Sequence, residues 1–440
     1  MKKLFLLFVI FLVASCAPGA PTQLYRSPAV AQQPSITMQD SDILLNRRSG
    51  YGPEKPNEID ERPYITASDL PELEVKNNKV NTISEKHKIA LLVPLTGESK
   101  ELGKSLLDSA QLAVFDIGET NLVLLPYDTK STVEGAKQAA EKAISENVDL
   151  FLGPLFSEDA KAVAPIAAKH DINVISFSNN EELIDYGVYL LGFMPEQQID
   201  RVIRYALDNG TKDFSIIAPK NKFGEVAVTE IRSTLSSEFK KPKYVEYYSP
   251  LDESMSSIID KFVKPIPKKD EKSPSKYEFK TSSQNYKTHA VLVPEGGRRA
   301  SNIASRMFRH GMESENIRLL GTGQWDDPSM LKEKKLYGSW FASSSPKYWQ
   351  IFEQHFKESY GYVPVRIASL AYDGIALAAY LASQNDFTKS AITNRRGYAG
   401  VNGVFRINSD GGSERALAVL EITENGFKII DPAPEDFSVF

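Results

Sequence analysis

The chain has 440 residues, 42% hydrophobic and 25% charged, a composition ordinary for a folded protein of two or three domains. The formal net charge is −5 at pH 7 and the pI is near 5.8, whereas nucleic-acid binders carry a basic excess. The acidic charge therefore argues against a nucleic-acid partner. The chain holds one cysteine, so no disulfide within the chain is expected.

The first sixteen residues have the pattern of a cleaved export signal, so residues 1–15 are expected to be a signal peptide. Lys2 and Lys3 precede ten consecutive apolar residues, Leu4 to Val13. This run is too short to span a bilayer, which takes roughly 20 residues. The following "VASC" (13–16) resembles the lipobox of bacterial lipoproteins. The resemblance implies that Cys16 is lipidated after cleavage; the alternative is an ordinary signal peptide with a cysteine near its cleavage point.

Residues 16–86 are expected to be a lipidated N-terminus followed by a flexible tether. The 70 residues after the cysteine contain eight prolines and show neither helical nor strand periodicity. The alternative for one part of this segment is that Tyr64 to Leu73 packs along the folded body. Ala17, directly after the cysteine, resembles the outer-membrane sorting signal of Gram-negative lipoproteins. The lipid is therefore expected to hold the chain in the outer membrane, facing the periplasm.

From residue 88 onward, short apolar runs alternate with amphipathic helical patterns. This alternation predicts an α/β fold with a doubly wound parallel sheet, because buried parallel strands are apolar on both faces. The predicted strands of the first unit are residues 88–95, 122–127, 150–155, 173–177 and 188–193. Those of the second unit are residues 214–219, 243–249, 289–295 and 318–325, with an exposed lysine- and serine-rich insertion at residues 264–287.

Two successive units of this kind resemble the type I periplasmic binding protein fold. The resemblance rests on segments such as "IALLVPLTG" (89–97), "LAYDGIALAAYLA" (370–382) and "GVNGVFRINSDGG" (400–412). It implies two doubly wound lobes joined by three interlobe crossovers. Lobe 1 is expected to comprise residues 87–195 plus 326–412, and lobe 2 residues 196–325 plus 413–440.

A narrower resemblance concerns function. The segments "GPLFSEDAKAVAPIA" (153–167), "VISFSNN" (174–180) and "GVYLLGFMPEQQIDRVIRYALDNG" (187–210) are similar to penicillin-binding protein activators. Members of that family are outer-membrane lipoproteins that stimulate peptidoglycan synthases. The resemblance implies that a peptidoglycan synthase, that is a penicillin-binding protein, is the partner of this chain in cell-wall synthesis.

A candidate ligand cleft lies where the strands end. In open parallel sheets the carboxyl ends of strands and the amino ends of helices together suit an anion or a carboxylate. Asp326 could receive an amino group and the indole of Trp325 could cover an apolar side chain, which resembles an amino-acid site. Each serine, threonine or asparagine among these positions is also a common cap or turn residue. The candidate residues are Thr96, Gly97, Ser157, Ser176, Ser178, Asn179, Trp325 and Asp326.

The nucleotide-binding, nucleophile-elbow and zinc-protease motifs are absent from the sequence, and the bare Ser-x-x-Lys match at 273–276 stands in a proline-broken loop that would not hold Lys276 against Ser273. No catalytic residue, metal or cofactor is therefore expected. The five histidines are scattered along the chain. Three hypotheses follow: a tethered activator of a peptidoglycan synthase, a receptor of an ABC importer for amino acids or similar small solutes, and, third, a hydrolase. The predicted tether and sorting signal favour the activator, because an importer's receptor must reach a permease in the inner membrane.

Overall fold

The computed structural model describes residues 86–118, 121–252, 255–266, 289–312 and 317–437. The expected signal peptide, the lipidation position Cys16, the tether and most of the expected insertion at 264–287 lie outside these residues. Two α/β lobes make up the described part, as the sequence predicts. No helix in the ranges given above is long and apolar enough to cross a membrane.

The first lobe is built on a five-stranded parallel sheet of order β2-β1-β3-β4-β5. Its strands are β1 (His87–Val93), β2 (Leu122–Asp128), β3 (Leu150–Leu152), β4 (Asn173–Ser176) and β5 (Tyr189–Leu190). The connecting helices are α2 (Lys100–Ile117), α3 (Val133–Ser145), α4 (Ser157–Ala168) and the 3₁₀ segment η1 (Glu181–Tyr186). Parallel neighbours need such crossover helices, which is why the predicted alternation of strand and helix is observed here.

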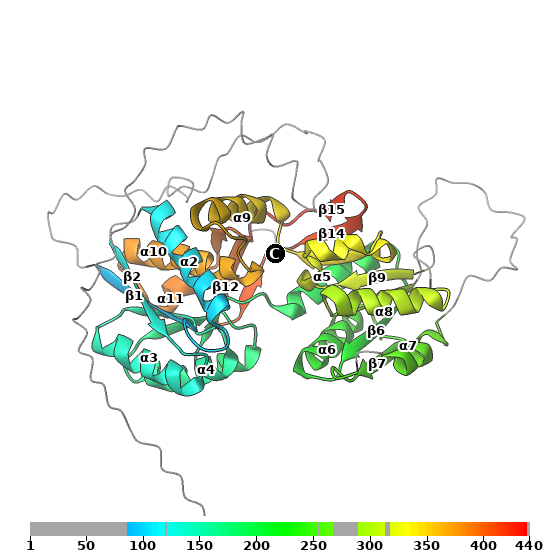
Figure 1. Cartoon of the computed structure of the whole chain (residues 1–440). Helices are drawn as coiled ribbons and strands as arrows, with labels where there is room; N and C mark the ends of the chain where they lie inside the picture. Colours follow the sequence, from blue (N-terminus) through cyan, green and yellow to red (C-terminus); the bar gives the residue numbers. More distant parts are fainter. Residues whose placement is uncertain (1–85, 119–120, 253–254, 267–288, 313–316, 438–440) are drawn as a thin grey trace, which may run out of the picture. The chain divides into compact units, whose positions relative to one another are not determined.

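Alternate residues of β1 enter two different cores. Ile89 and Leu91 pack in the core that includes α2 and the later helix α10 (Ser369–Gln384). Ala90 and Leu92 pack in the core that includes α3 and α4. Figure 1 shows α3 and α4 on one side of this sheet and α2 and α10 on the other. The strand is therefore apolar throughout because helices cover both of its faces.

The second lobe contains a seven-stranded sheet of order β15-β14-β10-β9-β8-β6-β7. Five strands are parallel neighbours: β6 (Asp213–Pro219), β7 (Tyr244–Tyr248), β8 (His289–Leu292), β9 (Ile317–Gly321) and β10 (Trp340–Ser343). The antiparallel pair β14 (Ala418–Thr423) and β15 (Gly426–Asp431) completes the sheet. The sheet is therefore mixed: its five parallel strands match the predicted doubly wound lobe, and the antiparallel pair was not among the predicted strands.

Four helices cover the second sheet: α5 (Pro195–Asp208), α6 (Lys222–Ser237), α7 (Ser256–Val263) and α8 (Gly297–Arg309). Helices α5 and α6 belong to one core, and α7 and α8 belong to the core on the other face. Three 3₁₀ segments follow β9, namely η2 (Gly323–Trp325), η3 (Pro328–Lys332) and η4 (Lys334–Leu336). They carry Trp325, Met330 and Leu336 into the same core as α8.

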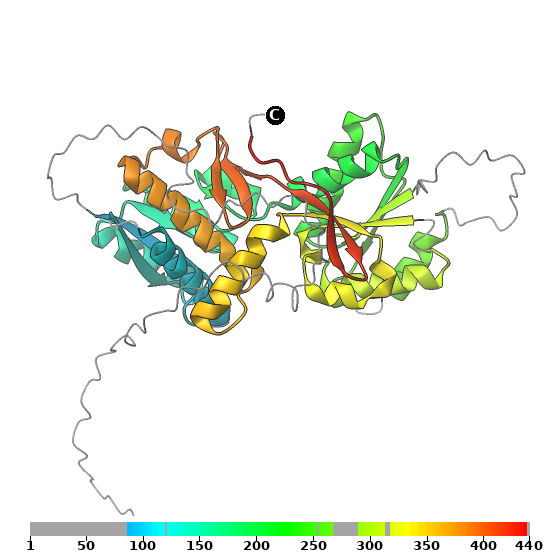
Figure 2. The same ribbon diagram turned by 90° about the horizontal axis from the view of Figure 1, so that it is seen from above.

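After β10 the chain returns to the first lobe. It forms α9 (Pro346–Tyr360), η5 (Arg366–Ala368), α10, α11 (Lys389–Ile392) and a three-stranded antiparallel sheet of β11 (Tyr398–Gly400), β12 (Gly403–Ile407) and β13 (Ser413–Arg415). Helix α10 packs on α2, and the orange α10 lies beside the blue α2 in Figure 2. The first lobe thus depends on residues far apart in the sequence.

The chain passes between the lobes three times: from β5 to α5, from β10 to α9, and from β13 to β14. Two expected boundaries differ from the structure. Residues 326–343 were expected in lobe 1, but β10 pairs with β9 and β14 in the second sheet. Residues 413–415 were expected in lobe 2, but β13 pairs with β12. Both errors concern strands of three or four residues: β10 pairs with β14 far along the chain, and β13 forms a hairpin with the preceding β12.

Candidate functional site: the strand ends and the crossovers

The loop after β1 is held by the carboxylate that ends β2. Asp128 Oδ1 accepts the backbone N–H groups of Leu95 and Thr96 at 2.9 and 3.0 Å, and Oδ2 accepts the Thr96 hydroxyl at 2.6 Å. Burial acts to raise the pKa of Asp128, but these hydrogen bonds outweigh it and lower the pKa. The Thr96 hydroxyl is therefore engaged in shaping the loop.

Gly97 is required by the same loop. Its φ is +86°, and a Cβ there would lie 2.6 Å from the carbonyl oxygen of Lys130. Only glycine combines this backbone conformation with so close a neighbour. The structure accordingly gives Gly97 a role in the loop itself.

Ser176, Ser178 and Asn179, at the end of β4 and just after it, also bond to the protein itself. The Ser176 hydroxyl donates to the Pro154 carbonyl at 2.7 Å and accepts the backbone N–H of Ser178 at 3.1 Å. Ser178 Oγ accepts the N–H of Asn180 at 3.2 Å, and exposed Asn179 donates to the Phe193 carbonyl at 3.4 Å. Ser176 and Ser178 are buried, so their hydroxyls face the protein rather than a ligand.

Ser157 begins α4 and is half-buried, and the preceding Phe156 is the N-cap residue with an exposed ring. The cap has no side-chain hydrogen bond. Among the first-lobe candidates, Ser157 thus lies beside an exposed ring at a helix amino end.

Trp325 lies in the core of the second lobe instead of lining a cleft. Its side chain is 0% exposed, its ring centroid is 6.4 Å from that of Phe341, and Nε1 donates to the Glu295 carbonyl at 2.5 Å. A Cβ on Gly321 would come within 2.1 Å of the indole, so the glycine at the end of β9 makes room for the ring. The expectation that this indole covers a ligand is wrong, because its faces are already packed.

Asp326 is also occupied by the protein. Its carboxylate Oδ2 accepts the Ser343 hydroxyl at 2.9 Å and lies 3.5 Å from Nε of Arg366 in η5. The Asp326 side chain is 3% exposed, so it is shielded from water. The structure therefore directs this carboxylate toward an arginine of the first lobe, and the expected contact with a ligand amino group is replaced by an internal one.

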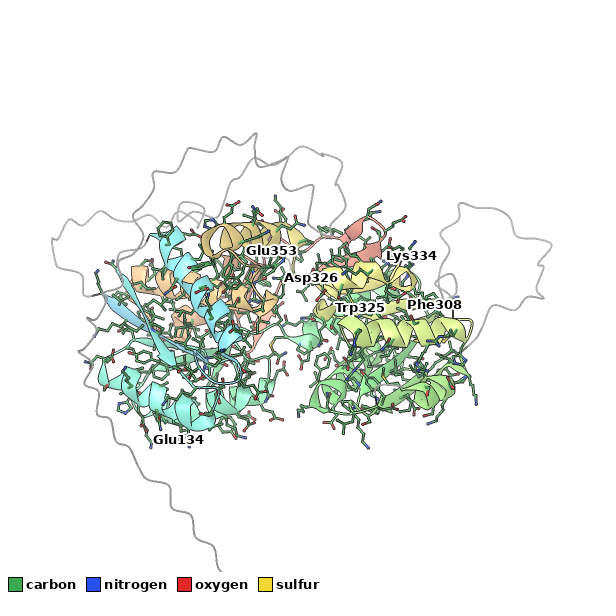
Figure 3. All side chains as sticks on the ribbon, in the orientation of Figure 1. Glu134, Phe308, Trp325, Asp326, Lys334 and Glu353 are labelled. Atoms are coloured by element: carbon green, nitrogen blue, oxygen red, sulfur yellow. The ribbon has the colours of Figure 1, made fainter. Side chains whose placement is uncertain are left out.

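Arg366 is held by the first lobe. Its Nη1 donates to Asn402 Oδ1 at 2.5 Å, and its guanidinium lies 4.2 Å from the Trp349 ring centroid and 5.4 Å from that of Phe193. Glu353 of α9 lies near this pair, as Figure 3 shows for Glu353 and Asp326. Burial raises the pKa of Glu353, with Arg366 acting to lower it and Asp326 to raise it.

A second arginine, Arg415 of β13, connects the start of the first crossover to helix α10. Arg415 is fully buried, and it donates from Nη1 to Asp373 Oδ2 at 2.9 Å and from Nη2 to the Leu191 carbonyl at 3.1 Å. Its guanidinium lies about equally far from the rings of Phe193 and Phe405, at 5.1 and 4.9 Å. Burial lowers the pKa of Arg415, and Asp373 opposes this shift.

Helix α5 starts directly on these crossovers. Gln197 Oε1 accepts the backbone N–H of Arg415 at 3.0 Å, and its amide donates to the Ser413 carbonyl. Gln198 Oε1 accepts the N–H of Gly323 at 2.7 Å, and Arg201 donates to the Leu417 carbonyl at 3.0 Å. The first and third crossovers are thus hydrogen-bonded to each other.

Sequence reasoning missed Arg366, Asp373, Arg415, Gln197 and Asn402. Gln197, Asp373 and Asn402 lie in segments that carry the family resemblance, but no role was assigned to them there, because their partners lie far away in the chain. The available signal was a charged residue inside an apolar helix, since Asp373 interrupts "LAYDGIALAAYLA" (370–382). A charge at a buried helical position calls for an opposite charge nearby.

The described residues hold no cluster of three or more histidine, cysteine or carboxylate side chains able to bind a metal. Within the same residues, Ser215 Oγ and His289 Nε2 form a hydroxyl–imidazole pair at 3.0 Å. Both residues are buried between β6 and β8, and burial lowers the pKa of His289 to about 4. A substrate cannot reach this pair, so it is part of the core.

Comparison with known proteins decides the family. A family model described as "Periplasmic binding protein" matches residues 86–426. The chain belongs to the periplasmic binding protein family. A putative branched-chain amino acid ABC transporter from Rhodospirillum rubrum has a similar structure, with a TM-score of 0.67 and 16% identity, covering 78% of this chain and 100% of that one. Likeness at this identity confirms the predicted type I fold.

Two curated relatives match this periplasmic binding protein over part of its length. The uncharacterized protein RP748 of Rickettsia prowazekii is 25% identical over 194 residues, 43% of this chain and 52% of that protein. The penicillin-binding protein activator LpoA of Photobacterium profundum is 25% identical over 191 residues, 42% of this chain and 31% of that protein. The chain thus spans about half of the first relative and about a third of the second. Family and fold are of the binding type, and they indicate a periplasmic or envelope location.

Proposed function

We propose that this periplasmic binding protein is a lipid-anchored envelope protein that binds and stimulates a peptidoglycan synthase of the penicillin-binding protein class. The observation that carries the proposal is the internal engagement of Trp325 and Asp326, the two second-lobe residues expected to hold a solute. A body whose solute contacts are replaced by its own side chains is better suited to binding a protein.

Two further observations support a synthase as the partner. The relative from Photobacterium profundum is named a penicillin-binding protein activator. The sequence also begins with a lipobox-like segment ending in Cys16, followed by a long proline-rich stretch that would let a tethered body reach a partner in the periplasm. Lipid attachment at Cys16 and an outer-membrane location are parts of this proposal.

The test is a reconstitution with a bifunctional peptidoglycan synthase from the same organism. The full chain, solubilised in detergent, should bind the immobilised synthase and should increase its glycan polymerisation or peptide cross-linking. A solute receptor of the same fold serves as the control and should do neither. Absence of binding together with unchanged rates of both reactions would contradict the proposal.

The second candidate is a solute receptor of an ABC importer. The observation that favours it is the fold, since the similar protein from Rhodospirillum rubrum is a putative branched-chain amino acid ABC transporter. A thermal-shift screen over the common amino acids distinguishes the two, because a solute at 100 times its Kd adds about 2.7 kcal/mol to the free energy of unfolding. A reproducible shift with one amino acid and no synthase stimulation would favour the receptor.

A further inference from the structure

Side chains of the two lobes meet at Asp326, Ser343 and Arg366, a group called here the Asp326 contact. Asp326 and Ser343 belong to the second lobe, and Arg366 belongs to the first. We propose that the Asp326 contact is a built-in latch that holds the two lobes in one relative arrangement without a bound solute. The inference concerns motion of the body alone and holds whether or not a synthase is the partner.

The contact is shielded from water on both sides. The Asp326 side chain is 3% exposed and that of Arg366 is 21% exposed, while their closest atoms, Oδ2 and Nε, are 3.5 Å apart. Attraction between opposite charges increases as water is excluded. Ser343 adds a hydrogen bond of 2.9 Å to the same carboxylate oxygen.

Each partner is backed by rigid structure. Arg366 is fixed by Asn402 and by the Trp349 and Phe193 rings described above. On the other side, Asp326 directly follows the buried Trp325, and Asp326 N–H donates to the Gly323 carbonyl at 3.1 Å. Gly323 is in turn bonded to Gln198 of α5. Neither group has to reorganise in order to meet the other, so little conformational entropy opposes the contact.

A second interlobe ion pair provides a natural comparison. Lys222 of α6 and Glu182 of η1 lie 2.8 Å apart, but their side chains are 66% and 60% exposed. Exposed pairs contribute little because water and salt screen them. Of these two ion pairs, the shielded one is therefore the one able to act as the latch.

The latch has a consequence for ligands. A solute shifts a conformational equilibrium only by its difference in affinity for the two states. Where an internal ion pair already stabilises one arrangement of the lobes, a solute that binds this arrangement shifts the equilibrium less. The arrangement is then determined mainly by contacts within the chain. The event that changes it is then the breaking of the Asp326 contact, for example by a partner that competes for Arg366.

Distance measurement between the lobes tests the proposal. The full chain with Cys16→Ser has no other cysteine, so spin labels can be placed at Glu141→Cys on α3 and Asn302→Cys on α8, both exposed. Pulsed electron paramagnetic resonance should give one narrow distance distribution for this parent. Asp326→Asn and Arg366→Gln should each broaden the distribution or shift it.

The matched control is Glu182→Gln, which removes the exposed interlobe pair and should leave the distribution unchanged. If a charge variant fails to fold, Ser343→Ala removes only the hydrogen bond to Asp326 and should still broaden the distribution. Narrow, unshifted distributions in all folded variants would overturn the proposal. Equal broadening in Glu182→Gln would overturn it as well. No synthase is present, so this outcome is separate from that of the stimulation assay.

Discussion

The buried ion pair of Arg415 and Asp373 links several segments near the crossovers between the lobes. The pair is shielded from water, and Asp373 also accepts hydrogen bonds from the Val401 backbone at 2.8 Å and the Asn402 amide at 3.0 Å. A Cβ on Gly400 would lie 2.1 Å from Asp373 Oδ1, so glycine is needed there. Such pairs cost desolvation to form, but breaking one leaves an uncompensated charge.

Replacing Arg415 with methionine should lower the free energy of unfolding by about 3–5 kcal/mol, because Asp373 would stay buried without a counter-charge. Equilibrium unfolding in guanidinium chloride measures the loss. The control is Lys222→Met, which removes the exposed partner of Glu182 and should change stability little. A loss in Arg415→Met no larger than in the control would contradict the assignment.

Glu196 at the start of α5 predicts a pH effect. Burial, with Glu181 and Glu230 nearby, raises its pKa to about 7, and its Oε2 atom is buried without a hydrogen-bond partner. A carboxyl group with a raised folded pKa contributes stability below its unfolded pKa, which is about 4.3. That contribution is lost as the pH rises through 7.

The Glu196→Gln variant tests this effect by comparison with the parent chain. Between pH 4.5 and 7 the parent should lose stability more steeply than the variant, because glutamine does not titrate. Thermal unfolding at several pH values gives both slopes. Parallel slopes would show that Glu196 ionises normally in the folded protein.

At the scale of elements, the sequence was most informative for buried strands. The predicted strand at 88–95 corresponds to β1 and that at 214–219 to β6, because helices on both faces demand uninterrupted apolar residues. The strand predicted at 318–325 ends at Gly321, because the chain turns there and the Trp325 ring packs against Gly321. Strand β10 was not predicted, because its four residues, "WFAS", stand between polar segments. Its partner β14 lies far along the chain.

The candidate site was less predictable than the strands. Periodicity placed Thr96, Ser176 and Ser178 near strand ends. It could not distinguish a hydroxyl available to a ligand from one that is hydrogen-bonded within the protein. The partner of Asp326 was equally hidden. Arg366 is an isolated charge in the sequence, and only the folded chain brings the two together.

Helices α2, α9 and α10 are joined by a polar contact that should titrate. His355 Nε2 of α9 lies 2.9 Å from Asp116 Oδ1 of α2, and the Tyr372 hydroxyl of α10 donates to Asp116 Oδ2 at 3.0 Å. The hydrogen bond with Asp116 raises the pKa of His355 above its usual value of 6.5, and burial opposes the shift. The stability from this contact is present below that unfolded value and is lost as the pH rises through the folded pKa.

An NMR titration of the His355 ring should therefore give a midpoint above that of an ordinary histidine, and Asp116→Asn should lower it. Free histidine in the same buffer serves as the reference. A midpoint unchanged by Asp116→Asn would show that the carboxylate does not set the titration.

At the scale of the whole molecule, the proposed anchor determines where the body acts. Replacing Cys16 with serine should release the protein from the membrane fraction into the periplasmic fraction, since acyl chains are the expected membrane contact. Cell fractionation with an antibody measures the distribution, and labelling with a radioactive fatty acid should be lost in parallel. Unlabelled parent protein would refute lipidation.

Within the residues that the structure describes, the antiparallel pair β14 and β15 comes after all the other helices and strands, yet it lies beside β10 in the second sheet. During synthesis or export, one edge of β10 therefore stays unpaired until β14 has emerged. The core of the first lobe is likewise incomplete until α10 has emerged and packs on α2. Neither half can mature before the other is nearly complete, so a chain shortened before residue 418 would leave an unpaired strand edge open to aggregation.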